Sequence, residues 1–531
     1  MKWHGNCGQE RERDESLASP GGPDRFRSDA IGHSCNRSGA NMTYTNGHKR
    51  DLERRRSSVC TRHGFLGGLL VLVPMLFCAG CANLAGPEYT RPEAPTKQGW
   101  SEQPSEVARG TEIIEPEWWK NFQDPYLDQL IAQALKESID IQILTARIDV
   151  ARGGVTQAEA VGQPRVGGSS GIDHFSFTDI DSTTRYSLAA EASWEIDIWG
   201  KIRKGVEAQQ AEYHATEADW RAGYLTLVAD VASRYFEIRQ LDEQSQRHAL
   251  SLQRNREILE IYQGMFREGL IPETQVMQQK AEVNRLQREL LEFARLRKIS
   301  ENGLATLVGM PADTLRVPEA PLRTVITAPE VPAGLPSQLL ARRPDILAAE
   351  YRVLQSHNLA GQARLARLPS INLTGRAGTA GFSLGDLFDA ATFGLASALT
   401  FPIFDPNLKA QIKVADAQTK VAEQEYRRSV ITAFEEVENA LTNLSSRKQQ
   451  KLQLEARERQ LSIVSEQIKA QLNEGLASQL EVFEVERSLL DAEQQLLINQ
   501  WEVLTDTIAL YKSLGGGWSE EVVGRSETNN Q

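Results

Sequence analysis

The sequence predicts a mainly α-helical chain of two tandem structural repeats, with four β-strands that contribute to a transmembrane β-barrel. Three observations predict this fold class. A short phrase recurs at an offset of 206 residues, as Gly269-Leu270 and again as Gly475-Leu476. Each copy of the phrase follows a helical pattern of about 65 residues, which is too long for the interior of a compact domain. Each copy also contains stretches of alternating apolar and polar residues, as in transmembrane strands.

The start of the chain has the features of a secretory signal. Three arginines at 54–56 precede an apolar run over 65–77, and small residues follow it. The run is shorter than the about 17–25 residues of a spanning helix, so we expect a signal peptide rather than a membrane anchor. The stretch that ends at Cys81 resembles a bacterial lipobox, which predicts cleavage before Cys81 and a covalent lipid on it. Ordinary signal cleavage near Ala79 is the alternative.

The composition argues against several classes of protein. The net charge of −12 argues against general nucleic-acid binding, which needs clustered lysine and arginine. All five cysteines lie at or before Cys81, so we expect neither a disulfide nor a thiolate metal site in the rest of the chain. The sequence has no His-x-x-x-His metal spacing and no Gly-Lys-Ser phosphate loop. We therefore expect no enzyme, no bound metal and no cofactor other than the lipid.

The two copies align over most of their length. Residues 136–147 correspond to 341–352, and 194–203 correspond to 400–409. A proline-rich stretch between the copies is typical of a surface linker. The expected segments are an N-terminal extension with the signal peptide (1–80), a lipid-anchored tether (81–117), repeat 1 (118–316), the linker (317–336), repeat 2 (337–518) and a tail (519–531).

Each repeat is predicted to contain a helix, a strand region, a very long helix and a returning helix. The first helices are expected at about 140–162 and 345–366, and the very long ones at about 201–268 and 407–473. At about 1.5 Å per residue, each very long helix spans about 100 Å. The Gly-Leu phrase marks a turn, after which a heptad-patterned helix of about 35 residues runs back. Each repeat should therefore form a long coiled-coil hairpin.

Four stretches have the pattern of barrel strands. The clearest is 188–199, in which apolar and polar residues alternate. The stretches 370–376 and 392–401 alternate in the same way, and a weaker fourth strand lies around 167–177. An apolar outer face and a polar inner face are typical of transmembrane barrels. A soluble sheet could alternate similarly, so the pattern alone does not place the strands in a membrane.

The alternation assigns roles to five residues of the clearest strand. Glu191, Glu195 and Asp197 share its polar face, so we predict that they line the barrel lumen and favour cations. Keeping the lumen wet is the alternative role for these acids. Trp194 and Trp199 are candidates for the aromatic girdle, and packing at the strand end is the alternative for them.

Four strands cannot close a barrel, because closure begins near eight strands. An open sheet edge in lipid would leave backbone groups unpaired, at a cost of several kcal/mol each. The chain is therefore expected to form an oligomer, in which two chains would give eight strands and three would give twelve.

Several further motifs follow the lipobox, and their order along the chain is informative. They are "GPEYTRP" (86–92), "WWKNFQDPYLDQLI" (118–131), "SWEIDIWGK" (193–201), "ARRPDI" (341–346), the two Gly-Leu phrases and "LYKSLGGGW" (510–518). In this order the chain from about Cys81 to Trp518 resembles the outer-membrane factor family. The resemblance is to the NodT-type lipoprotein branch of these TolC-like channels.

The resemblance implies a homotrimer with a 12-stranded barrel and a periplasmic tunnel built from the helical hairpins. It implies a lipid-anchored protein in the outer membrane of a Gram-negative bacterium, in contact with outer-membrane lipids. Such a protein is a passive exit duct for small molecules such as drugs. Its partners would be a periplasmic adaptor protein and an inner-membrane pump of the resistance-nodulation-division type.

The resemblance also assigns a role to the turns of the hairpins. Gly269, Leu270, Gly475 and Leu476 would dock against the adaptor, although the glycines could serve only to make the turn. Several members of the family carry a gate aspartate directly after the second Gly-Leu, where this chain has Ala477. Nearby acids that could replace it are Glu268, Glu273 and Glu474.

Two other classes of protein share some of these features. A periplasmic adaptor also has a lipid anchor and a helical hairpin, but it normally has one hairpin rather than two. A coiled-coil structural lipoprotein would not need strands between its helices. The doubled unit and its strands distinguish an exit duct from both.

Overall fold

The computed structural model describes one unit of the chain, which lies within residues 71–531. The described stretches are 84–97, 99–101, 116–177, 180–322, 329, 331 and 336–516. Cys81, the predicted lipidation site, lies outside the described residues.

The helices and strands follow the same order twice. Two short elements come first, the 3-10 helix η3 (Trp118–Phe122) and the helix α2 (Pro125–Glu137). The first copy consists of α3 (Ile139–Val161), β1 (Arg165–Phe177), β2 (Ile180–Ile196), α4 (Lys201–Arg267) and α5 (Glu273–Leu307). The short helix α6 (Pro336–Arg342) precedes the second copy, which consists of α7 (Pro344–Leu365), β3 (Ser370–Gly381), β4 (Ala391–Thr400), α8 (Pro406–Asn473) and α9 (Gln479–Ser513). The predicted tandem repeat is confirmed.

The very long helices begin and end almost where the sequence predicts. α4 has 67 residues and α8 has 68, and the returning helices α5 and α9 have 35 each. Asp405 fixes the start of α8, because its carboxylate accepts hydrogen bonds from the amides of Asn407 at 2.8 Å and Leu408 at 3.3 Å. Pro406 at the first helical position has no N–H to satisfy. No helix in the described residues combines the length and the apolar character needed to cross a bilayer.

The strands of both repeats form one antiparallel sheet in the order β1-β2-β3-β4. The central pair joins the repeats, since β2 pairs with β3 along eleven positions from Tyr186–Gly381 to Ile196–Ile371. β1 and β4 are the edge strands, and every residue of β4 is exposed. The sheet of one chain is therefore open at both sides.

The strand predicted over 188–199 ends earlier, at Ile196, and begins earlier, at Ile180. The extension to Trp199 was wrong because the chain turns into α4 at this point. The carboxylate of Asp197 accepts a hydrogen bond at 2.8 Å from the amide of Arg203, in the first turn of that helix. Such an amide has no partner within the helix, so Asp197 caps the helix instead of extending the strand.

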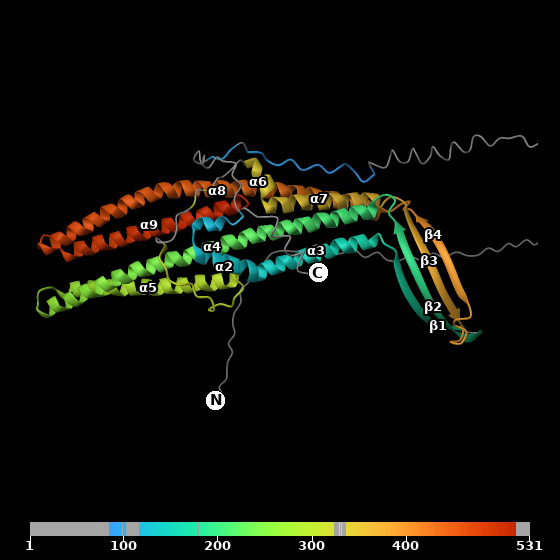
Figure 1. Cartoon of the computed structure of the whole chain (residues 1–531), viewed down its shortest axis with the longest axis horizontal. Helices are drawn as coiled ribbons and strands as arrows, with labels where there is room; N and C mark the ends of the chain where they lie inside the picture. Colours follow the sequence, from blue (N-terminus) through green and yellow to red (C-terminus); the bar gives the residue numbers. More distant parts are fainter. Residues whose placement is uncertain are drawn as a thin grey trace, which may run out of the picture. The chain divides into compact units, whose positions relative to one another are not determined.

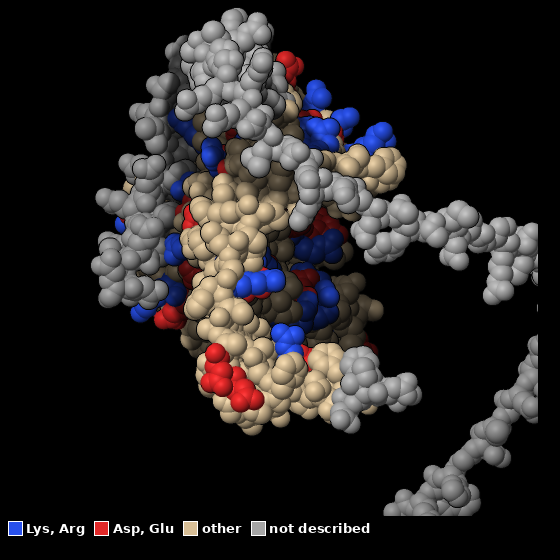
Figure 2. Space-filling model, turned by 90° about the vertical axis from the view of Figure 1, so that its right-hand side faces the viewer, with Lys and Arg blue, Asp and Glu red and all other residues tan. Residues whose placement is uncertain are grey.

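The sheet and the hairpin turns lie at opposite ends of the long helices. β2 leads directly into the start of α4, and the turn to α5 follows 67 residues later. At the helical rise this is a separation of about 100 Å. Figure 1 shows the sheet at the right and the turns α4–α5 and α8–α9 at the left. From the sheet end, a continuous band of uncharged side chains faces the viewer (Figure 2).

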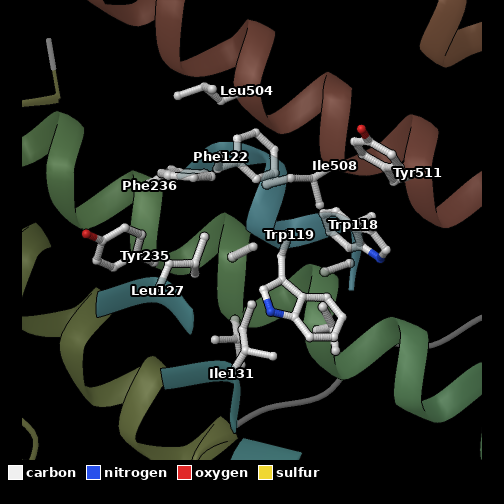
Figure 3. Packing of buried hydrophobic residues seen from close by; sticks show 14 of the residues in the cluster. Trp118, Trp119, Phe122, Leu127, Ile131, Tyr235, Phe236, Leu504, Ile508 and Tyr511 are labelled. Carbon is white, nitrogen blue, oxygen red and sulfur yellow. The ribbon is translucent and has the colours of Figure 1, made fainter. Parts of the chain in front are cut away.

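A hydrophobic core joins η3 and α2 to the middle of the long helices (Figure 3). Trp118 is 1% exposed and stacks on Tyr511 of α9, with ring centroids 4.8 Å apart. Phe122 meets Phe236 of α4 edge to face at 5.1 Å. Because these rings come from both repeats, the core fixes the first repeat against the second.

Candidate functional site

The two faces of the sheet differ completely in charge. Among strand residues with described side chains, one face has no charged residue and carries most of the large apolar side chains. The apolar members of this face are Val166, Ile172, Leu188, Trp194, Ile196, Ile371, Leu373, Phe393, Leu395 and Leu399. Phe393 and Leu395 are 84% and 88% exposed, which is costly in water and favourable in lipid. This face suits the hydrocarbon core of a membrane.

The opposite face carries both signs of charge. Glu191 pairs with Arg376 of β3, whose Nε donates to a carboxylate oxygen at 3.0 Å. Glu195 binds Lys201 of α4 at 2.5 Å. Asp197 lies beyond the strand. The predicted excess of acid on this face is therefore offset by basic neighbours, and the expectation of cation preference loses its basis in these three acids.

The two tryptophans bind the junctions between helices and strands. The indole of Trp194 donates to the carbonyl oxygen of Gly162, after the end of α3, at 2.8 Å. The indole of Trp199 donates to the carbonyl oxygen of Pro369, just before β3, at 2.7 Å. Both therefore lie at the helical end of the sheet, and Trp194 shares its apolar face. A girdle role for them stays a prediction.

The two hairpin turns have the same backbone geometry. Gly269 and Gly475 adopt φ of +72° and +75°, which favours glycine. The amides of Leu270 and Leu476 each donate to a carbonyl five residues earlier, at 2.8 Å. This is the Schellman arrangement of a helix C-terminus. It leaves Leu270 and Leu476 69% and 79% exposed.

The predicted gate acids are exposed around these turns. Glu268 and Glu474 follow the last residues of α4 and α8, where the negative end of the helix macrodipole disfavours a carboxylate. Glu273 begins α5, where the positive end favours one. None of the three forms an ion pair with a described residue. Their place at the turn is as the sequence predicts, and their role as a gate stays a prediction.

The sequence did not reveal the path of the N-terminal segment, residues 84–97 and 99–101. Its Ala85 carbonyl accepts a hydrogen bond from Arg364, near the end of α7, at 3.2 Å. Further on, Arg91 pairs with Glu350 at 2.7 Å, and Trp100 packs edge to face on Phe434 of α8 at 6.3 Å. The segment therefore runs along the second repeat, from near the sheet toward the core.

The chain matches a known family of proteins. Residues 130–310 and 335–516 match the outer membrane efflux protein family. The chain belongs to this family. It is 29% identical over 436 residues to the pyoverdine export outer membrane protein OpmQ of Pseudomonas putida, covering 80% of this chain and 92% of OpmQ. It is 30% identical over 467 residues to the probable outer membrane lipoprotein SilC of Salmonella typhimurium, covering 85% and 99%.

Solved structures agree with this membership. The open state of the MtrE outer membrane channel of Neisseria gonorrhoeae superposes with a TM-score of 0.73 at 27% identity, covering 82% of this chain and 98% of MtrE. The relatives are transport channels rather than enzymes. The outer membrane efflux protein described here is thus an outer-membrane channel of a Gram-negative bacterium, the exit duct of a tripartite efflux system.

Proposed function

We propose that three copies of this outer membrane efflux protein close one 12-stranded barrel and one helical tunnel, through which small molecules leave the cell. The observation that carries the proposal is the open sheet, with β1 and β4 as free edges and one uncharged, largely apolar face. In lipid each unpaired backbone group costs several kcal/mol, so the edges must pair with other copies. Three four-stranded sheets exceed the minimum of about eight strands for closure, and leave a bore.

The hairpin tips are the proposed docking surface for a periplasmic adaptor. Gly269 and Gly475 present Leu270 and Leu476 to solvent at the end farthest from the sheet. Exposed leucines on two turns of equal geometry offer apolar surface that a partner could remove from water. Acids at helix C-termini, as at Glu268 and Glu474, cost rather than add stability, which favours a role in binding or gating for them. The pump that drives export would be an inner-membrane protein of the resistance-nodulation-division type.

A lipid on Cys81 would anchor the chain in the inner leaflet of the outer membrane. Ala85 is held against Arg364, six residues before β3 begins at Ser370. In the sequence Cys81 precedes Ala85 by four residues, a length of chain that spans at most about 14 Å. An acyl chain there would enter the leaflet beside the barrel. Replacement of Cys81 by serine should abolish labelling by radioactive palmitate, whereas unchanged labelling would contradict the assignment.

The proposal is tested by mass and by conductance. Purified protein in detergent, corrected for bound detergent, should have three times the mass of the mature chain. In a planar bilayer the same preparation should give discrete channel currents. A stable monomer, or a trimer without current even after deletion of the hairpin tips, would refute the duct. The adaptor and scaffold alternatives predict the absence of current.

A further inference from the structure

We propose that the barrel bore is charge-balanced, and that Arg165, Arg185 and Arg376 determine its selectivity by cancelling its acids. The bore then discriminates little between cations and anions and suits cargo without a fixed sign of charge, such as neutral or zwitterionic molecules. This inference rests on the proposed barrel, because the sheet face in question becomes a bore only when copies of the chain close it.

The strand register places all charged strand residues with described side chains on one face. Opposite partners in the ladder share a face, and side chains alternate along each strand. On this basis Asp173, Glu191 and Glu195 lie on the same face as the three arginines, giving three charges of each sign. Among the strand side chains that the structure describes, the other face has no Asp, Glu, Lys or Arg. The net charge of these six strand residues is zero in each chain, before Lys201 of α4, which binds Glu195, is counted.

The opposite charges also lie next to one another. Arg376 faces Glu191 directly in the register, and Nη2 adds a second hydrogen bond at 3.4 Å to that of Nε at 3.0 Å. Asp173 faces Arg185 directly across β1 and β2. Arg165 faces Ser193, the residue of the same face that lies between Glu191 and Glu195. Adjacent opposite charges largely cancel beyond a few ångströms, so a passing ion experiences little net field.

The three arginines are also the longest side chains on this face of the sheet. The remaining residues of this face are mainly glycine, alanine, serine and threonine, as at Gly167, Ser169, Gly378, Gly394 and Ala396. In a trimer each arginine would form a ring of three long cationic side chains on a wall of small ones. Their removal should therefore change both the width of the bore and its sign.

The pair of Arg376 and Glu191 is exposed to solvent in the single chain. The side chains of Arg376 and Glu191 are 70% and 48% exposed in the single chain. Exposed pairs contribute little to stability, so replacing one partner should leave the fold intact. The same exposure lets both groups act on ions in the bore. Arg376 and Glu191 are thus suited to a test of selectivity that does not disturb assembly.

The test is the reversal potential of single channels in a planar bilayer under a potassium chloride gradient. The hairpin tips are deleted in every preparation, so that the tip acids do not contribute, and the unmodified protein in this test is the one without a further substitution. For the unmodified protein we expect a cation-to-anion permeability ratio within about threefold of one. Arg376→Gln should shift the reversal potential toward cation preference and raise conductance. Glu191→Gln should shift it toward anion preference. Arg376→Lys, which keeps the charge, is the matched control and should behave like the unmodified protein.

The double variant E191Q/R376Q distinguishes charge balance from general disturbance. It removes one charge of each sign, so its reversal potential should return to that of the unmodified protein. Currents with strong cation preference in the unmodified protein, or currents whose reversal potential is the same in all variants, would overturn this inference and leave the duct standing. The absence of current from every preparation would overturn the duct as well.

Discussion

Gly269 and Gly475 hold the same left-handed backbone conformation in two turns that lie 206 residues apart in the chain. In both, the glycine amide donates to a carbonyl three residues earlier at 2.9 Å, and the next leucine donates to one five residues earlier at 2.8 Å. The repeat therefore extends to individual hydrogen bonds. Equal turns on two hairpins would give a closed trimer six nearly equivalent tips.

The tip glycines are expected to tolerate a side chain poorly. Gly269→Ala forces a residue with a Cβ into positive φ, which costs about 1 kcal/mol and loosens the turn. We expect faster amide hydrogen exchange across 262–276, measured by mass spectrometry, and weaker capture of the adaptor.

Gly264→Ala is the matched control for the tip. Gly264 lies inside α4, and a Cβ there meets no atom within 4 Å. Alanine should slow exchange in the same peptides, since it favours a helix over glycine by about 1 kcal/mol. If both alanine variants protect the tip equally, the left-handed geometry does not limit its stability.

Local signals predicted most of the helical part. The Glu-Gly-Leu phrases predicted the C-terminal ends of α4 and α8 to within one residue, because a Schellman turn needs glycine at a fixed position. The heptad seam gave the returning helices, since Val283 and Leu286 recur at the spacing that faces a neighbouring helix. These features depend on residues that are close in sequence, so the local sequence pattern is enough to predict them.

The features that the sequence did not predict depend on distant residues. Alternation placed Glu191 and Arg376 on polar faces, but only the register between repeats places one opposite the other. Asp197 continues the alternation of β2, yet its carboxylate is used by the amide of Arg203. Which basic residue lies opposite a given acid depends on the register between two strands. The alternation within one strand does not determine that register.

Trp118 is expected to be essential for the core. Its ring is 1% exposed and packs on Tyr511, so Trp118→Ala would leave a large cavity and destabilise the fold by about 3–5 kcal/mol. We expect a marked fall in the midpoint of thermal unfolding in detergent. Trp194→Ala is a useful control, because Trp194 lies at the sheet and is 38% exposed. If the unfolding midpoint fell equally in both variants, the core around Trp118 would contribute no more to stability than the contacts of Trp194.

A buried ion pair closes the base of the first hairpin. Arg297 of α5 binds Asp242 of α4 at 2.5 Å and donates to the Val317 carbonyl at 2.7 Å, where the linker begins. Burial raises the pKa of Asp242, and Arg297 opposes this effect. Arg297→Met would leave the Asp242 carboxylate with Arg239 at 3.6 Å and the Ala320 amide at 3.3 Å, and it would also remove the 2.7 Å partner of buried Glu301. We expect a cost of about 3–5 kcal/mol.

The double variant D242L/R297M tests that explanation. Removing both charges should recover part of the lost stability, because the Asp242 carboxylate is no longer buried without Arg297. The recovery should be incomplete, since Arg239 and Glu301 each lose one buried partner. Unfolding midpoints in urea would measure both variants. Arg295→Gln on the same helix breaks an exposed pair with Glu292 and should leave the midpoint unchanged. A double variant as unstable as the single one would place the effect in packing rather than charge.

His248 should make the first hairpin sensitive to acid. The side chain is 3% exposed; its Nδ1 lies 3.0 Å from the Gln244 carbonyl and its Nε2 3.4 Å from Glu289 of α5, with Arg285 nearby. Burial lowers the pKa of His248 below its ordinary value of about 6.5. The unfolded chain then binds a proton at a higher pH than the folded chain does. The corresponding stability is present above about pH 6.5 and is lost as the pH falls through the lowered folded pKa.

This sign predicts a larger drop in unfolding midpoint for the unmodified protein than for His248→Gln, when the pH is lowered from about 7.5 to 5.5. His214→Gln is the control, since His214 is 49% exposed and pairs with Glu217 on its own helix. It should keep the pH dependence of the unmodified protein. Glu289 acts in the opposite direction, because its negative charge favours protonated His248. A pH dependence that survives in His248→Gln would assign the acid sensitivity to other groups, and a reversed one would mean that Glu289 outweighs burial.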